Sequence, residues 1–273
     1  MRAPGRPARL LIPALLLPLA LAACGGSDSD GGGTTSGSSA SGSSSSDVTA
    51  RLEASSKALA AVKSYHLVAS QTDPDGYTTI TGDITAEGRA SVLVRLGPTA
   101  LRLKVLPGAA YARGNAEYWT ANLGKDGKAV ADRIADTWVK LPASSADVTD
   151  LLDGFAPKTL AACLLVGNGT LKAGPQESID GTPADVLIDA GDQPGTSPSR
   201  LLTATSGPPL PLRVVQTGPR RPGGTPDKRC DDPDDRSTAS EATLSAFDRP
   251  VTVEAPDGAI ELPGGDAGSG ASS

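Results

Sequence analysis

The sequence has a single histidine, His66, and only 3% aromatic residues. A Ser-His-Asp or Cys-His mechanism would therefore depend on this one residue, which lies inside a predicted strand. The chain also lacks a His-Glu-x-x-His motif, cysteines at zinc-binding spacing and a P-loop, and Gly167-Asn168-Gly169 is interpreted as a turn. Carboxylate pairs of the kind used in glycoside hydrolysis are spatial and leave no motif. These absences predict a protein that is not an enzyme and uses no cofactor.

Basic residues are outnumbered, with 25 Lys and Arg against 31 Asp and Glu. Three of them (Arg2, Arg6 and Arg9) lie in a predicted leader, and without them 22 basic residues face 31 acidic ones, a formal charge of −9. Because nucleic acids are bound by clustered Lys and Arg, this balance predicts no nucleic-acid partner. It also argues against a polybasic grip on anionic lipid headgroups.

A cluster of carboxylates near the second half of the chain offers oxygen ligands for calcium. Its members are Asp227, Asp231, Asp232, Asp234 and Asp235. They lack the one-three-five spacing, the central glycine and the closing glutamate of an EF-hand loop. A solvated loop is the favoured interpretation, and no metal site is predicted.

The N-terminus has the profile of a signal peptide over residues 1–23. The three arginines precede an uncharged apolar run, Leu10 to Leu21, which is shorter than the roughly 20 residues of a transmembrane helix. Leu21-Ala22-Ala23-Cys24 resembles a bacterial lipobox, so Cys24 is expected to carry a diacylglyceryl anchor and to begin the mature protein. An ordinary signal peptide with a coincidental cysteine is the alternative.

Low-complexity segments flank the predicted folded region. Residues 25–46 are almost entirely Gly, Ser, Thr and Asp, which predicts a disordered tether behind the lipidated residue 24, with a root-mean-square reach of roughly 25 Å. Residues 263–273 have a similar composition and predict a disordered tail. One folded domain is expected over residues 47–262, held at the extracytoplasmic face of the cell membrane.

Two cysteines remain after lipidation of Cys24, namely Cys163 and Cys230. An even pair in an exported protein predicts a disulfide, which on the chain-entropy model stabilises the fold by on the order of 4 kcal/mol. Two free thiols or a redox site are the alternatives, but the Cys-x-x-Cys spacing of a redox site is absent.

Hydrophobic periodicity predicts an α+β fold. A helix is expected from Val48 to about Lys63, capped by Ser46 or Asp47, and short β-rich runs from Tyr65 to Arg113 predict an antiparallel meander. Further helices are expected at Ala116 to Leu123, Lys128 to Ala135 and Pro157 to Leu165. Later β-like runs end with a long one from Ala242 to Glu254. The expected fold is a large curved antiparallel sheet with helices packed on one face.

One face of this predicted sheet is apolar. The seven residues expected to line a lipid-binding cleft on it are Val92, Val94, Leu101, Leu103, Val105, Leu212 and Val214. Any half-buried antiparallel sheet has such a face, so packing alone also explains the pattern. The low aromatic content leaves few bulky groups to fill the space, which permits an apolar ligand.

Two sequence blocks carry a resemblance to a known family. Tyr111-Ala112-Arg113-Gly114-Asn115 with Tyr118-Trp119, and Trp138-Val139-Lys140, following a lipobox and tether, resemble the actinobacterial LppX, LprA, LprF and LprG lipoproteins. The resemblance implies a LolA-like half-barrel with helices closing one side over an apolar cavity. Tyr111, Arg113, Tyr118 and Trp119 would lie near its mouth, although core packing explains Trp119 and Trp138 equally well.

That resemblance implies a membrane-anchored lipoprotein that binds or carries an acylated lipid or lipoglycan. The insert from Pro219 to Arg236 and the cysteine pair do not match the family pattern, so the resemblance does not identify the ligand. The alternative is an envelope sensor or adaptor that binds an export or envelope protein and has no ligand cavity.

Overall fold

A computed structural model describes residues 45–74, 76–123, 127–141, 153–165, 169–224, 230 and 238–261. The predicted leader, Cys24, residues 25–44 of the predicted tether, the five clustered carboxylates and the tail lie outside these residues. The prediction of a disordered tether is wrong for Ser45 and Ser46, which begin a helix. The described chain divides into two compact units. Unit 1 comprises the described residues of Val62–Ala156 and those from Ser245 onward, and unit 2 comprises helix α1 (Ser45–Ala61) together with the described residues of Pro157–Leu244.

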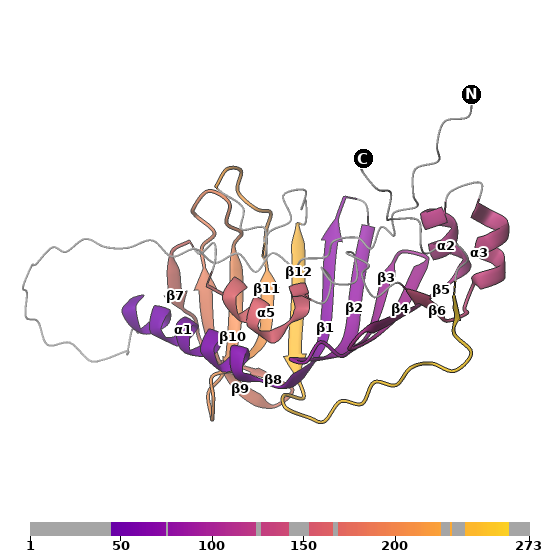
Figure 1. Cartoon of the computed structure of the whole chain (residues 1–273). Coiled ribbons are helices and arrows are strands. Elements are labelled where there is room, and N and C mark those ends of the chain that lie inside the picture. The colour runs from indigo at the N-terminus through magenta and orange to yellow at the C-terminus, as the bar shows by residue number, and fades with distance from the viewer. Residues whose placement is uncertain are drawn as a thin grey trace, which may run out of the picture. The chain divides into compact units, whose positions relative to one another are not determined.

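Unit 1 is built on a meander of hydrogen-bonded strands (Figure 1). Its elements are β1 (Ser64–Asp73), β2 (Gly76–Thr85), β3 (Ala90–Leu96), β4 (Thr99–Leu106), β5 (Ala109–Gly114), α2 (Ala116–Leu123), α3 (Lys128–Ile134), β6 (Val139–Leu141) and β13 (Ile260–Glu261). The strands lie in the order β13-β6-β5-β4-β3-β2-β1. All neighbours are antiparallel except β13 and β6, which are parallel, so the predicted meander is confirmed.

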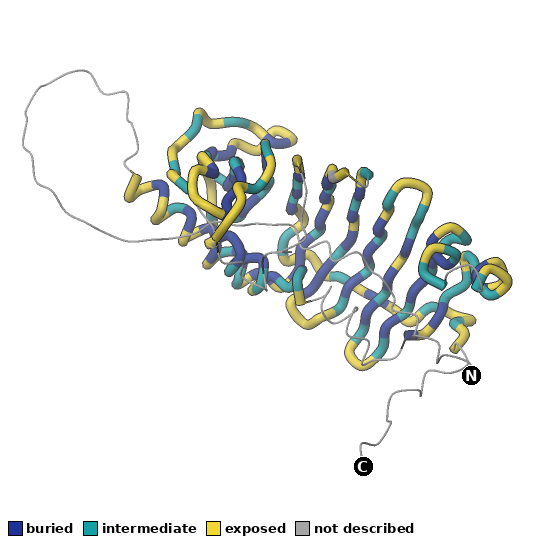
Figure 2. The backbone as a smooth tube through the Cα atoms, turned by 90° about the horizontal axis from the view of Figure 1, so that it is seen from above, coloured by how far each residue is buried: buried dark blue, intermediate teal, exposed yellow. Residues whose placement is uncertain are grey.

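Strands of unit 1 alternate between buried residues and residues of intermediate or full exposure, as Figure 2 shows. In β3, Ala90, Val92 and Val94 are buried, whereas Arg95 on the other face is exposed. We call the face that carries Val92 the inner face and the opposite face the outer face. Successive side chains of a strand point to opposite faces, so apolar residues at every second position give the strand one buried side.

Helix α2 packs against β4 and β5. Trp119 on this helix is fully buried, which confirms its core-packing interpretation, and Tyr118 meets it edge-on with ring centroids 5.1 Å apart. Gly114 ends β5 beneath the helix, where an added Cβ atom would lie 3.0 Å from Trp119 Nε1 and closer still to Tyr118. The glycine of the Tyr-x-Arg-Gly-Asn block thus lets the helix approach the strand closely.

Unit 2 consists of two helices and a second group of antiparallel strands. Its elements are α1 (Ser45–Ala61), α5 (Pro157–Cys163), β7 (Leu171–Ala173), β8 (Glu177–Ile179), β9 (Thr182–Asp189), β10 (Ser199–Ala204), β11 (Pro211–Gln216) and β12 (Ala239–Ser245). The order is β12-β11-β10-β9-β7, and β8 also pairs with β9. The α+β class and the open antiparallel arrangement are therefore confirmed.

Helix α1 buries the predicted apolar stripe, including Val48, Leu52 and Leu59. It begins at Ser45, so Ser46 and Asp47 lie in its first turn and the predicted cap is wrong by one or two residues. Helix α5 packs against α1, and Ser56 Oγ donates a 2.7 Å hydrogen bond to the Ala161 carbonyl oxygen. No helix in the described part of the chain is both long and apolar enough to span a membrane.

The predicted β run from Ala242 to Glu254 is wrong beyond Ser245, where β12 ends. Ala246 (φ 51°) and Asp248 (φ 57°) adopt the left-handed conformation, which breaks the extended chain. The Asp248 backbone N–H donates to the Ser64 carbonyl oxygen at 2.9 Å, so the turn is tied to the start of β1. The backbone then continues to β13, a short parallel strand that the sequence pattern did not reveal.

The predicted disulfide between Cys163 and Cys230 is present, with the two Cα atoms 5.3 Å apart. It links the end of α5 to a residue 67 positions later in the chain. Both cysteines belong to unit 2 and are buried.

All eight aromatic residues of the chain belong to unit 1. They are two Trp, four Tyr and two Phe, and neither α1 nor Pro157–Leu244 contains one. Unit 2 is therefore packed with aliphatic side chains, such as the cluster of Ile179, Val186 and Leu202 with Ile188 and Leu212 against it.

Candidate functional site

Five of the seven predicted lining residues share the inner face of unit 1. Val92 pairs with Leu103, Val94 pairs with Leu101, and Val105 lies opposite Ala90. Their exposed fractions range from 1% for Leu103 to 6% for Val94 and Val105. A ligand reaches these side chains only if the groups that cover them move aside.

The other two residues, Leu212 and Val214, lie on opposite faces of unit 2. Val214 pairs with Leu201, whereas Leu212 packs against the cluster that contains Leu202. The register between β10 and β11 shifts at this point, so that one strand has an extra residue. Such a bulge reverses the alternation of side chains, and the prediction that both residues face one cleft is wrong.

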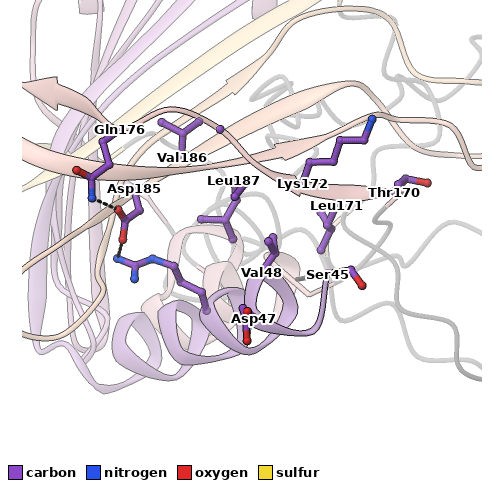
Figure 3. A pocket seen from close by; sticks show the side chains of 13 residues that line it. Ser45, Asp47, Val48, Thr170, Leu171, Lys172, Gln176, Asp185, Val186 and Leu187 are labelled. Atoms are coloured by element: carbon purple, nitrogen blue, oxygen red, sulfur yellow. Dashed lines mark hydrogen bonds and ion pairs between the residues drawn. The ribbon is translucent and has the colours of Figure 1, made fainter. Parts of the chain in front are cut away.

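A cavity of about 750 Å³ lies in unit 2 between the first half of α1 and strands β7 and β9 (Figure 3). Val48 comes from the helix, and Leu171 and Leu187 come from the two strands. Ala173, which pairs with Leu187, and Val186 are further apolar residues of the lining. The cavity falls within the roughly 300–1,000 Å³ range of ligand pockets.

The polar end of this cavity is formed by Arg51, Asp185 and Gln176. Figure 3 shows the Gln176 side chain directed toward the Asp185 carboxylate. The Arg51 guanidinium forms an ion pair with the Asp185 carboxylate, and Gln176 Nε2 donates to Asp185 Oδ1 at 2.6 Å. Arg51 also donates to Thr203 Oγ1 and to the Ala204 carbonyl oxygen, both at 3.0 Å. About a third of the Arg51 side chain and a quarter of that of Asp185 remain exposed, at 32% and 26%.

This arrangement is amphipathic, because a paired charge lies beside an apolar hollow. The pair is suited to binding a polar headgroup, and the aliphatic lining is suited to an acyl chain. Lys172 also lines the cavity, and Figure 3 shows its amine directed away from the apolar residues.

Sequence reasoning missed this cavity, although one signal was present. Arg51 lies between Val48 and Leu52 on α1, one turn from residues of the buried stripe, where a cation is unexpected. Its partner, Asp185, follows more than a hundred residues later in the chain. No local pattern connects the two residues.

One edge of the cavity is fixed by a pair of carboxylates. Asp189 accepts hydrogen bonds from the backbone N–H groups of Gly169 (3.0 Å) and Gly191 (2.7 Å), and burial raises its pKa to about 6. Asp192 accepts from the Thr170 hydroxyl at 2.6 Å and from its backbone N–H at 2.7 Å, and these hydrogen bonds lower its pKa. Because Thr170 lines the cavity, the two carboxylates hold the start of β7 in place.

His66 lies on the outer face of unit 1, in a row that runs across three strands. It pairs with Asp83, and Asp83 pairs with Ser91. His66 Nδ1 lies 2.9 Å from Asp83 Oδ1, and Arg249 approaches the same oxygen at 3.5 Å. A catalytic triad requires the imidazole between the hydroxyl and the carboxylate, whereas here the carboxylate is in the middle.

No group of three or more metal-ligating side chains occurs in the described ranges of the chain. The clustered carboxylates that were weighed as calcium ligands lie outside those ranges.

No protein-family model and no curated protein sequence matches this chain. Among solved structures, LprF from Mycobacterium bovis is similar at 17% identity over 77% of this chain and 97% of LprF, with a TM-score of 0.48. Lipoprotein LppX from Mycobacterium tuberculosis is similar at 16% identity over 77% of this chain and 100% of LppX, with a TM-score of 0.47. MucB is similar at 13% identity over 78% of this chain and 60% of MucB, with a TM-score of 0.32. LprF and LppX belong to the group of lipoproteins that the sequence blocks resemble.

Proposed function

We propose that this protein is a lipid-anchored, extracytoplasmic and non-enzymatic protein that binds an acylated lipid. The observation that carries the proposal is the 750 Å³ cavity under α1, with its aliphatic lining and its polar end. An acyl chain would lie along Val48, Leu171 and Leu187, and the headgroup would lie at Arg51 and Asp185. Burial of each methylene of such a chain contributes about 0.8 kcal/mol, so about ten buried methylenes correspond to the roughly 8 kcal/mol of a micromolar Kd.

The position of the cavity supports this proposal. Ser45 and Asp47, at the start of α1, belong to its lining. Because α1 begins at Ser45, the tether would span residues 25–44, and the lipidated Cys24 would hold the cavity within a tether length of the bilayer, roughly 25 Å. A lipid acceptor placed there needs no catalytic group.

The proposal is tested on the chain from residue 24 onward with Cys24→Ser, exported in an actinobacterial host and purified without detergent. Native mass spectrometry is followed by solvent extraction and lipid analysis. We expect an added mass that extracts as an acylated species. A protein that stays unliganded after incubation with total envelope lipids would contradict the proposal and leave the protein-binding adaptor as the alternative.

Two matched substitutions locate the bound lipid. Ala173→Trp places an indole in the cavity and is expected to abolish the added mass. Ala239→Trp is the control, because Ala239 is an exposed strand alanine of the same unit outside the cavity. Equal loss in both variants would show that the cavity under α1 is not the binding site.

The sequence also predicts that the inner face of unit 1 contacts the lipid, and this prediction is tested separately. Val94→Thr keeps the side-chain size and adds a hydroxyl to this face, at the position that pairs with Leu101. We expect lipid occupancy to be unchanged if the cavity under α1 is the site. If Val94→Thr loses the lipid and Ala173→Trp keeps it, the lipid binds at the inner face of unit 1 and not in the cavity under α1.

A further inference from the structure

Three arginines gather on the outer face of unit 1, and we call them the arginine patch: Arg95, Arg102 and Arg113. Arg102 lies directly opposite Arg113 on the neighbouring strand. Arg95 pairs with Ala100, which places it diagonally to Arg102 on the same face. Adjacent strands are about 4.8 Å apart, so the three side chains originate close together.

Among the described residues, only one of these three arginines has an acidic partner. Arg113 Nε lies 3.9 Å from an oxygen of Asp136, whose side chain is 71% exposed. Arg95 and Arg102 are both exposed and form no ion pair within the residues that the structure describes. Like charges directly opposite each other destabilise a pair of strands, and this protein has a net charge of −6. The patch therefore lowers the stability of the local strand pairing, and its positive charge is opposite in sign to the net charge of the chain.

Other cations on the outer face have partners within the protein. Lys104 lies 5.4 Å from the centroid of the Trp138 ring and donates to the Glu254 carbonyl oxygen at 3.2 Å. Lys140 donates to Glu261 at 2.8 Å. The two hydrogen bonds involve the C-terminal segment, and within the described ranges Arg95 and Arg102 are the cations of this face that have no such partner.

Exposed amphipathic and apolar side chains accompany the patch. Val68 is 47% exposed and belongs to the same cross-strand row as Arg102, through Thr81 and Leu93. Tyr77 is 57% exposed and lies on the same face at the start of β2. Arginines interleaved with a tyrosine and aliphatic residues are typical of surfaces that bind the interfacial region of a bilayer, where Arg meets phosphate and Tyr lies at headgroup level.

We propose that the arginine patch, with Tyr77 and Val68, docks unit 1 onto an anionic membrane surface. The net charge of the whole chain conceals such a surface, because acidic residues elsewhere outweigh three arginines on one face. This docking goes beyond lipid binding in the cavity, and it holds whether or not the cavity takes a lipid.

The test is vesicle co-sedimentation of the chain from residue 24 onward with Cys24→Ser, so that no acyl chain contributes. Phosphatidylcholine vesicles are compared with vesicles that also contain phosphatidylglycerol. We expect binding only to the anionic vesicles, and we expect it to fall as sodium chloride is raised. Each arginine near the surface is expected to contribute about fivefold in the partition coefficient, so Arg95→Gln with Arg102→Gln should lower it by roughly 25-fold.

The matched control is Lys57→Gln with Lys158→Gln, which removes two exposed cations of unit 2 and gives the same net charge. This variant should bind like the unsubstituted chain. Equal weakening in both double variants would overturn the proposal, because net charge rather than the patch would then control binding. Failure to bind anionic vesicles, or equal binding to both kinds of vesicle, would also overturn it, and an acidic protein would become the candidate partner.

Discussion

Unit 1 and unit 2 fill their interiors in different ways. Unit 1 contains all eight aromatic residues of the chain, and the largest buried side chain, Trp119, fixes α2 against β4 and β5. Unit 2 contains no aromatic residue, has the only disulfide found in the described residues, and encloses the cavity under α1. The difference shows that, without bulky side chains, unit 2 relies on a covalent link and a few polar contacts, and space remains inside it.

This contrast has a physical basis. A buried aromatic side chain contributes a large apolar area, and short aliphatic chains contribute less. The register shift in β11 and the three-residue strands β7 and β8 also leave unit 2 with fewer regular ladder contacts than the long hairpins of unit 1. The next four predictions test whether the two units depend on these different devices.

The largest effect is expected in unit 1. Trp119→Ala should lower the free energy of unfolding by about 3 to 5 kcal/mol, because it removes a fully buried indole and leaves a cavity. Denaturant unfolding followed by far-UV circular dichroism measures this loss. Trp138→Ala is the comparison, since Trp138 is partly exposed and should lose much less. Equal losses in the two variants would contradict the assigned role of Trp119.

Removing the disulfide tests unit 2. Cys163→Ala with Cys230→Ala should cost about 2 to 4 kcal/mol, because a loop that spans 67 positions is no longer closed in the unfolded chain. Both tryptophans belong to unit 1, so their fluorescence follows unit 1 alone, whereas circular dichroism follows both units. We expect the dichroism transition to begin at lower denaturant than the fluorescence transition. If the two transitions shift together, the units unfold as one and the comparison fails.

A smaller effect is expected for the polar link between α1 and the strands of unit 2. Arg51→Met keeps the aliphatic stem but removes the hydrogen bonds to Thr203 and Ala204 and the ion pair to Asp185, and should cost about 1 to 2 kcal/mol because the site is partly exposed. Lys57→Met on the same helix is the exposed control. Denaturant unfolding followed by circular dichroism compares the unfolding free energies of the two variants. Equal values would show that Arg51 does not stabilise the link between α1 and the strands.

The last effect is a pH dependence in unit 2. Burial raises the pKa of Asp189 from 3.8 to about 6, so the folded protein binds this proton more tightly than the unfolded chain. The contribution of Asp189 to stability therefore increases as pH falls from about 6 to 4, and it is least favourable above pH 6. Asp189→Asn keeps an acceptor oxygen but cannot titrate. We expect the difference in unfolding free energy between the two proteins to change across this window, and a constant difference would contradict the raised pKa.

Much of the local structure could be predicted from the sequence. The helix at Ala116 to Leu123 has the bounds that its pattern predicts, and the hairpins of unit 1 follow from period-two alternation and turn residues such as Gly97 (φ 52°) and Gly108 (φ 78°). The cysteine pair was predicted from an even count in an exported chain. In each case the signal lies in a few neighbouring residues or in simple composition.

The faces of unit 2 could not be predicted in this way. Leu212 is the extra residue of β11, and the bulge there places it on the opposite face from Val214. A bulge of this kind shifts the alternation of side chains without changing the composition of the strand. The end of β12 depends on left-handed residues that are not glycine, namely Ala246 and Asp248. Such conformations are sustained by contacts with distant residues, here the hydrogen bond from Asp248 to Ser64.

By itself, the sequence determined the α+β class, the meander of unit 1, the stripe of α1 and the pairing of Cys163 with Cys230, because these depend on local periodicity or on a count. Only the tertiary structure decided that Arg51 meets Asp185 beside a cavity, and that Arg95, Arg102 and Arg113 share one surface. The physical reason is that cavities and charged surfaces arise from the register and packing of segments far apart in the chain. Net charge and composition average over those positions and retain no record of which residues become neighbours.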